Sequence, residues 1–315
     1  MPERCVGTEE GRRVFRAGII LVVLALAAVR VWAQDVAILE KGCAKNDFQS
    51  CALLGLKYDE GSGVRQDKAR AAAFFSRACN GGIAFACSTL GVMFEEGDGV
   101  GRDNARAVAL YSQACEGGNA FACANLGVMH EEGRGLPQDK PKAVALYTRA
   151  CDGGIGFGCF NLSLMYGNGE GVRADKPKAV ELLTRACDAG EAVGCSNLGA
   201  LYSSGDGVPR DKLKAMELYA RACDGGGAAG CNNLGTMYSI GEGVGRDKAR
   251  AVELYTWACD GGEAAGCHNL GALYRSGDGV RQDARKALEL FGKACNLKHE
   301  AGCRSLAALK RQGAK

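Results

Sequence analysis

The stretch at 231–259 reads CNNLGTMYSIGEGVGRDKARAVELYTWAC and decides the fold. Its first part places Leu234, Met237 and Tyr238 at positions i, i+3 and i+4, which is the spacing of one helix face. A G-x-G loop then breaks that helix, and a second apolar face recurs at helical spacing after Asp247. The stretch therefore predicts two helices joined by a glycine-containing loop, which is one helical hairpin.

This hairpin is one copy of a unit that repeats every 36 residues. Pairs of cysteines with the spacing C-x7-C mark each copy, and the step between successive pairs never changes. Repeats of this length form solenoids, in which each unit buries its apolar face against its neighbours. We therefore expect an all-α fold, an α/α superhelical solenoid of helical hairpins. It should occupy residues 34–315 as a single array of about seven and a half to eight repeats.

An aspartate opens each predicted second helix. Its short carboxylate can accept hydrogen bonds from the free amides of the first helical turn, as an N-cap does. We also expect a half hairpin at each end of the array. Residues 35–43 should form a lone second helix with Ile38 and Leu39 at core positions, and residues 300–310 a lone first helix. The aspartates are Asp67, Asp103, Asp139, Asp175, Asp211, Asp247 and Asp283.

Each C-x7-C pair spans the end of one hairpin and the start of the next. The first cysteine closes a second helix, a small-residue turn follows, and the second cysteine lies just inside the next first helix. Structural zinc sites, the competing use of cysteine, usually pair ligands at C-x2-4-C, and the sequence has no such pair. We therefore predict disulfides and no metal. The predicted pairs are Cys43–Cys51, Cys79–Cys87, Cys115–Cys123, Cys151–Cys159, Cys187–Cys195, Cys223–Cys231, Cys259–Cys267 and Cys295–Cys303.

An apolar run near the N-terminus predicts export. Three arginines between positions 12 and 16 precede the run at 17–29, which is short for a membrane span. Residues 31–33 then offer a small-residue cleavage site. We expect residues 1–33 to be a signal peptide, with a retained anchor as the alternative. The protein should then be periplasmic or secreted, a compartment in which disulfides persist, and free of the membrane after cleavage.

The charge balance gives no sign of a nucleic-acid partner. The formal net charge is +3, and residues 1–33 hold five arginines and three glutamates, so the remainder carries +1. Charges of both signs are interspersed along the repeats. Neither nucleic acid nor anionic lipid is therefore an expected partner.

The repeat resembles a known family. The pattern N-L-G-x-M/L-Y, followed by G-x-G-V-x-x-D-x-x-K/R-A-x-x-L-Y-x-x-A-C-D-x-G, resembles the Sel1-like repeat, a relative of the tetratricopeptide repeat, over residues 35–311. The cysteine pair in every unit is similar to the secreted, cysteine-rich Hcp family of bacteria. The resemblance implies a scaffold that binds protein or peptide segments in a concave groove. Some Hcp members are described as penicillin-binding proteins with weak β-lactamase activity. The resemblance therefore also allows a protein that binds or hydrolyses β-lactams, or binds a peptidoglycan-like ligand.

The sequence offers no catalytic motif for that enzymatic alternative. S-x-x-K, S-D-N, K-T-G, G-x-S-x-G and H-E-x-x-H are all absent. The histidines His130, His268 and His299 occupy different repeat positions, which disfavours a metal cluster or a Ser–His pair. His130 fills a slot that is Tyr or Phe in most copies, which favours a core role. Catalytic residues stay unassigned, enzymatic activity stays open, and no cofactor is expected.

Candidate ligand-binding residues lie on the predicted first helices, which line the inner face of related solenoids. An asparagine recurs one residue before the packed leucine, and its amide can donate to and accept from a peptide backbone. The preceding position varies between copies and includes Phe160 and His268. Variation at this preceding position is expected of a surface with its own specificity, but unconstrained solvent-exposed positions also vary. The asparagines, for their part, could instead form hydrogen bonds within the array. The asparagines are Asn125, Asn161, Asn197, Asn233 and Asn269.

Overall fold

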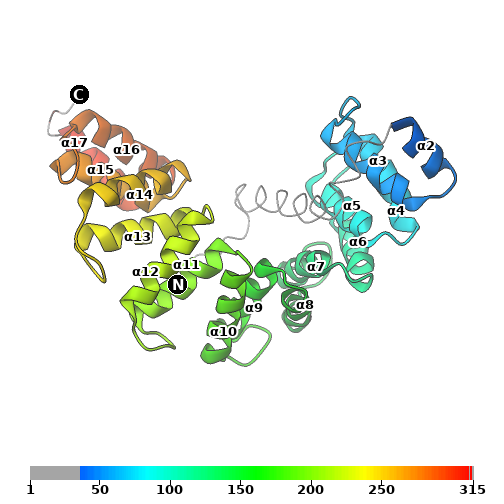
Figure 1. Ribbon diagram of the computed structural model, residues 1–315, viewed down its shortest axis with the longest axis horizontal. Coiled ribbons are helices and arrows are strands. Elements are labelled where there is room, and N and C mark those ends of the chain that lie inside the picture. The colour runs from blue at the N-terminus through cyan, green and yellow to red at the C-terminus, as the bar shows by residue number, and fades with distance from the viewer. Residues whose placement is uncertain (1–35, 312, 314–315) are drawn as a thin grey trace. The chain divides into compact units, whose positions relative to one another are not determined.

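The fold is an all-helical repeat solenoid, as predicted. The computed structural model describes residues 36–311 and residue 313, so the predicted signal peptide lies outside the described residues. The described part contains sixteen α-helices and no strand (Figure 1). In chain order the helices are α2 (Val36–Ala44), α3 (Phe48–Glu60), α4 (Lys68–Asn80), α5 (Ala84–Glu96), α6 (Asn104–Glu116), α7 (Ala120–Glu132), α8 (Lys140–Asp152), α9 (Gly156–Asn168), α10 (Lys176–Asp188), α11 (Ala192–Ser204), α12 (Lys212–Asp224), α13 (Ala228–Ile240), α14 (Lys248–Asp260), α15 (Ala264–Ser276), α16 (Ala284–Asn296) and α17 (Glu300–Arg311).

The helices belong to two compact units, which meet between Asn119 and Ala120. In each unit the odd-numbered helices are the first helices of the hairpins and the even-numbered ones are the second. A first helix packs most closely against the second helix that follows it, and that second helix packs against the next first helix. Within the second unit, successive first helices from α9 to α17 also contact one another, more than successive second helices do.

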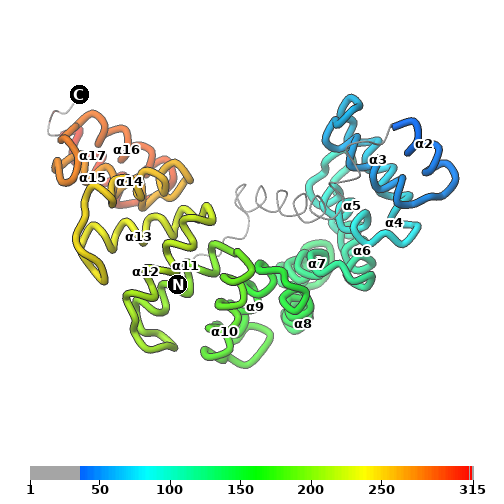
Figure 2. Tube along the Cα trace, viewed as in Figure 1, coloured from blue at the N-terminus to red at the C-terminus, as the bar shows by residue number. Residues whose placement is uncertain are grey.

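Two kinds of connection alternate along the chain (Figure 2). Within a hairpin, a G-x-G loop leads from the first helix to the second, and Gly241 and Gly243 both have positive φ angles there. An aspartate then caps the second helix. Asp247, for example, accepts a hydrogen bond on Oδ1 from the Arg250 amide at 2.9 Å. The cap is present at all seven predicted aspartates, which confirms that prediction.

Between hairpins the turn is shorter and carries a disulfide. Seven of the predicted pairs form, with Cα–Cα distances of 4.4–4.7 Å. Cys115 and Cys123 are also disulfide-bonded. Each pair joins the end of a second helix to the following first helix, so the bridges follow the boundaries between repeats.

A glycine on the first helix faces an aromatic ring on the second helix of the same hairpin. A Cβ added to Gly199 would lie 2.9 Å from the Tyr219 ring, too close for any side chain. In the hairpin α9–α10 both positions differ, with Ser163 on the first helix and Leu183 on the second. A larger first-helix residue is thus paired with a smaller second-helix residue. The glycine–aromatic pairs are Gly55–Phe75, Gly91–Tyr111, Gly127–Tyr147, Gly199–Tyr219, Gly235–Tyr255 and Gly271–Phe291.

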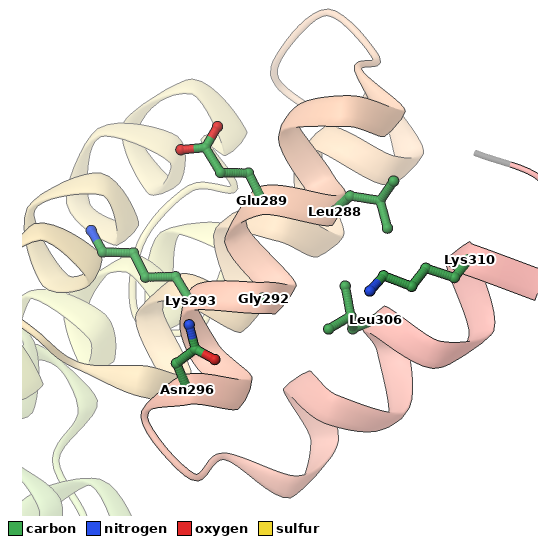
Figure 3. A pocket seen from close by; sticks show the side chains of 7 residues that line it. All are labelled: Leu288, Glu289, Gly292, Lys293, Asn296, Leu306 and Lys310. Carbon is green, nitrogen blue, oxygen red and sulfur yellow. The ribbon is translucent and has the colours of Figure 1, made fainter. Parts of the chain in front are cut away.

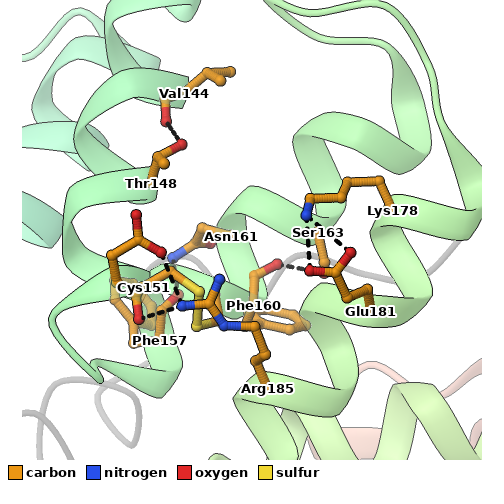
Figure 4. Close-up of a disulfide and its surroundings, with 12 residues drawn as sticks. Val144, Thr148, Cys151, Phe157, Phe160, Asn161, Ser163, Lys178, Glu181 and Arg185 are labelled. Carbon is orange, nitrogen blue, oxygen red and sulfur yellow. Dashed lines mark hydrogen bonds and ion pairs between the residues drawn. A yellow bond between two sulfur atoms is a disulfide. The ribbon is translucent and has the colours of Figure 1, made fainter.

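Arginines link successive second helices beside the disulfides. Arg185 on α10 donates from Nη2 to the Cys151 carbonyl at 3.0 Å and to Asp152 Oδ1 at 2.9 Å (Figure 4). Arg221 on α12 makes the same pair of contacts one repeat later. The guanidinium therefore places a positive charge at the carbonyl end of the preceding second helix, where it is favourable. We call this contact the arginine link; in α14 its position is taken by Trp257, which is 53% exposed.

One predicted core residue is not in the core. Ile38 on α2 is 62% exposed, whereas its neighbour Leu39 is buried as predicted. The prediction for Ile38 is wrong because the described residues contain no first helix to complete the hairpin of α2. In the complete hairpins of the second unit, which have that first helix, the corresponding leucine is at most 6% exposed.

Candidate binding site on the first helices

The asparagine ladder is not one uniform surface. Asn125 and Asn161 are buried, and the other three members are half-buried. Asn161 donates from Nδ2 to the Phe157 carbonyl at 3.0 Å, one turn back on its own helix (Figure 4). Asn197 makes the same contact with the Val193 carbonyl at 2.8 Å. These two amides therefore serve their own helices, while the buried Nδ2 of Asn125 has no hydrogen-bond partner among the described residues.

Phe160, the aromatic candidate, also lies inside the array. Its side chain belongs to a core cluster that contains Leu162 and Leu182. Ser163 donates its hydroxyl proton to the Phe160 carbonyl at 2.6 Å. The part of the predicted surface that is open to a partner therefore lies further along the chain.

A continuous polar surface begins at α13. Asn269 on α15 donates from Nδ2 to Asn232 Oδ1 on α13 at 2.9 Å, and Asn232 contacts Asn233 at 3.4 Å. On the other side of α15, His268 Nε2 lies 3.2 Å from Ser305 Oγ on α17. All five side chains are half-buried. We call this set, which crosses three neighbouring first helices, the polar row.

Two histidines come together at the end of the polar row. The ring centroids of His268 and His299 are 5.1 Å apart, and the His268 ring also lies 5.5 Å from that of Phe291. His299 precedes α17 and accepts on Nδ1 from the Gly302 amide at 3.1 Å. The sequence spacing did not indicate this pair, because the two histidines occupy different repeat positions and only the turn before α17 brings them together.

The electrostatic setting favours a neutral imidazole in the polar row. Burial is the main cause that lowers the pKa of His268, and the nearby His299 lowers it further. The other four members of the row carry uncharged amides or a hydroxyl. Such groups can donate to and accept from a peptide backbone without the cost of burying an unpaired charge. Within the described residues, no three His, Cys, Asp or Glu side chains come together as a metal-holding group.

Sequence reasoning missed Ser305, although a signal for it was present. Ser305 lies exactly one repeat after Asn269, in the asparagine position of α17. The signal is the position in the repeat, because the residue type there changes from asparagine to serine. The contact with His268 is a serine–histidine pair of the kind that the different repeat positions of the histidines disfavoured.

Helices that could cross a membrane are absent from the described part of the chain, because none there is both long and apolar enough.

Comparison with known proteins gives a family match along most of the chain. The Sel1 repeat matches seven consecutive stretches: residues 49–83, 84–119, 120–155, 156–191, 192–227, 228–263 and 264–299. No curated protein matches the chain.

Solved structures with a similar fold include two that cover nearly the whole chain. One is c5321, a protective antigen of uropathogenic Escherichia coli strains with an SLR fold. It has a TM-score of 0.74 and 25% identity, over 98% of this chain and 68% of that one. Another is a Sel1 repeat protein from Oxalobacter formigenes, with a TM-score of 0.72 and 25% identity, over 96% and 90% of the two chains. Cysteine rich protein B of Helicobacter pylori is 31% identical over 41% of this chain and 93% of its own, with a TM-score of 0.35.

Proposed function

The chain belongs to the Sel1 repeat family, and from that premise we propose that it is an exported scaffold that binds peptide segments of partner proteins along its first helices. Repeat solenoids of this kind present extended surfaces for protein–protein interaction. The proposal includes a concave groove, export of the chain and a set of residues that contact the partner. Each has its own support and its own test.

The observation that carries the proposal is the polar row. Its amide, imidazole and hydroxyl groups lie side by side on α13, α15 and α17, with Asn232, Asn269 and His268 already bonded across helix boundaries. An extended peptide exposes one donor and one acceptor per residue, which is what such a row can match. Closer contact among first helices than among second helices supports a concave groove on the first-helix side of the second unit.

A peptide display experiment tests the binding surface. Random peptides displayed on phage would be selected on the disulfide-intact protein, and the dissociation constants of the enriched peptides measured. Replacing Asn233 and His268 together by alanine should weaken binding at least about tenfold, which corresponds to about 1.4 kcal/mol. Glu217, exposed on the second helix α12, provides the matched control, and Glu217→Ala should bind as the parent does. Equal binding by all three proteins would place the site elsewhere.

Export is supported by the disulfides at the boundaries between repeats. Disulfides form and persist in oxidising compartments and are rare where thiols are kept reduced. We propose that residues 1–33 direct the chain to the periplasm or beyond and are removed there. Mass spectrometry of the protein from the producing cell tests this, since cleavage would leave Gln34 at the N-terminus. An intact leader on a protein with free thiols would contradict it.

A second candidate function, β-lactam binding or slow hydrolysis as in the cysteine-rich Hcp proteins, is favoured by one contact. His268 Nε2 lies within hydrogen-bonding reach of Ser305 Oγ, the arrangement in which an imidazole can take the proton of an attacking hydroxyl. Incubation with a chromogenic cephalosporin, followed by intact-mass analysis, would detect hydrolysis and a covalent adduct. An adduct lost in Ser305→Ala would support this function. A protein that gains no mass and turns over nothing would exclude it.

A further inference from the structure

Two helices of the described chain lack the hairpin partner that every other helix has. α2 is a second helix without a first helix before it among the described residues, and α17 is a first helix without a second helix after it. α2 presents the exposed side chain of Ile38. α17 and α16 border a shallow hollow of 510 Å³, lined by Leu288, Gly292 and Leu306 among others (Figure 3).

The apolar residues at these two open faces match each other by position. Ile38 occupies the position at which the five complete hairpins of the second unit have a leucine, at most 6% exposed. In four of these hairpins that leucine shares a core cluster with a leucine twenty residues earlier, on the first helix. Leu306 is that first-helix leucine on α17, and it is only half-buried. The leucine pairs are Leu162–Leu182, Leu198–Leu218, Leu234–Leu254 and Leu270–Leu290.

The glycine–aromatic rule gives a second, independent match. The glycine position of the first helix is Ala307 in α17, and the aromatic position of the second helix is Leu39 in α2. A first-helix residue with a Cβ would clash with a ring but not with a smaller side chain. The chain already contains that combination as Ser163 and Leu183. Leu39 is already buried on its own side of the contact, so this layer places no aromatic ring against Ala307, and Ile38 and Leu306 supply the exposed apolar surface.

The arginine link gives a third match. Lys41 on α2 occupies the arginine position, and Asn296 at the end of α16 occupies the position of its aspartate acceptor. The neighbouring copy of this contact uses lysine already, since Lys293 donates from Nζ to Asp260 Oδ1 at 3.2 Å. Asn296 lines the hollow (Figure 3). A second helix placed in the hollow could therefore be fixed by the same contact that links the others.

We propose that the hollow at α16 and α17 binds α2 of a second copy of this chain, completing a hairpin in the register of the repeat. Ile38 of one copy then packs on Leu306 of the other, Leu39 faces Ala307, and Lys41 reaches Asn296. The two surfaces differ, so the contact is heterologous and each copy carries one surface of each kind.

Sedimentation velocity of the protein as purified from the producing cell, over a range of concentrations, tests this interface. The parent protein should form species larger than a dimer as concentration rises. Ile38→Asp disables the α2 surface and Leu306→Asp the hollow, so each variant alone should stay monomeric. An equimolar mixture of the two should stop at a dimer, because only one intact surface of each kind remains. Leu213, 60% exposed on α12, provides the control, and Leu213→Asp should associate as the parent does.

A charge exchange keeps the test decisive if Leu306→Asp disturbs folding. Lys41 and Asn296 are both exposed, so changes there leave the core intact. Lys41→Glu should weaken association by up to about fivefold, and adding Asn296→Lys in the same chain should restore it. A parent protein that is monomeric at every concentration would overturn the proposal, as would occupation of the α2 surface by residues 1–35 of the same copy. A mixture of the two aspartate variants without dimers would do the same.

Discussion

At the scale of single residues, the chain shows paired changes that keep the volume of each hairpin layer constant. Most hairpins pair a glycine with an aromatic residue, as in Gly199 and Tyr219. The hairpin α9–α10 pairs a larger residue, Ser163, with a smaller one, Leu183. The residue at one position cannot be predicted without the other, because the side-chain volume allowed at one depends on the side chain that faces it. The helical spacing predicts that both residues are buried but does not say that they touch.

Substitutions in the Gly199–Tyr219 pair should therefore be non-additive. Gly199→Ala should reduce the free energy of unfolding by about 1–3 kcal/mol, because its Cβ would press on the Tyr219 ring. Adding Tyr219→Leu should recover part of that loss, with a coupling of about 0.5–3 kcal/mol in a double-mutant cycle from urea unfolding. Gly292→Ala, which meets no atom within 4 Å, should not destabilise the protein. Additive losses would show that the layer does not act as a pair.

Two histidines with lowered pKa values, His130 and His268, should make stability fall in weak acid. Burial is the main cause that lowers the pKa of both His130 and His268, so the folded state binds fewer protons than the unfolded state below their ordinary pKa of 6.5. The contribution of these histidines to the free energy of unfolding should be fully present well above that pH and decrease as the pH falls through 6.5 to 5.5. The variant with His130→Phe and His268→Asn should lose this dependence. Urea unfolding at pH 7.5 and 5.5 measures it, and an unchanged slope would contradict the assignment.

At the scale of helices, the sequence predicts nearly everything that follows from periodicity. Hairpin boundaries, aspartate caps and disulfide positions all recur at a fixed step, so a rule learned on one copy applies to the next. The features that the sequence did not predict depend on contacts that do not follow the 36-residue period. His299 meets His268 through the turn before α17, and Ile38 is exposed because its covering helix is missing from the described part.

The arginine link offers a test at this scale, because Trp257 takes the arginine position in α14. Trp257→Arg on α14 should restore the contact to the end of α12, where Cys223 and Asp224 offer a carbonyl and a carboxylate. The gain should be small, up to about 1 kcal/mol, because the site is largely exposed. Arg221→Ala should lose a similar amount one repeat earlier. Thermal or urea unfolding measures both, and a destabilised Trp257→Arg would mean that the indole makes a contribution of its own.

At the scale of the whole molecule, stability is spread along the chain and not gathered in one centre. Core clusters succeed one another along the second unit, and each hairpin touches mainly its neighbours. A solenoid of this kind behaves as a sum of repeat stabilities and nearest-neighbour terms. The disulfides lie at the boundaries between repeats, so each one stabilises the contact between two neighbouring repeats. Their contribution should therefore be local.

Removing one central bridge should test that locality. In the chain-entropy account, a loop of this length contributes about 2–3 kcal/mol, so replacing Cys187 and Cys195 by alanine should destabilise the repeats on either side by that order. Hydrogen exchange should show lost protection in α10 and α11, with little change in α15 and α16. Replacing Cys295 and Cys303 should reverse the pattern and affect α16 and α17. Uniform loss of protection along the second unit in both variants would mean that it unfolds as one cooperative block, and that the bridges stabilise it as a whole.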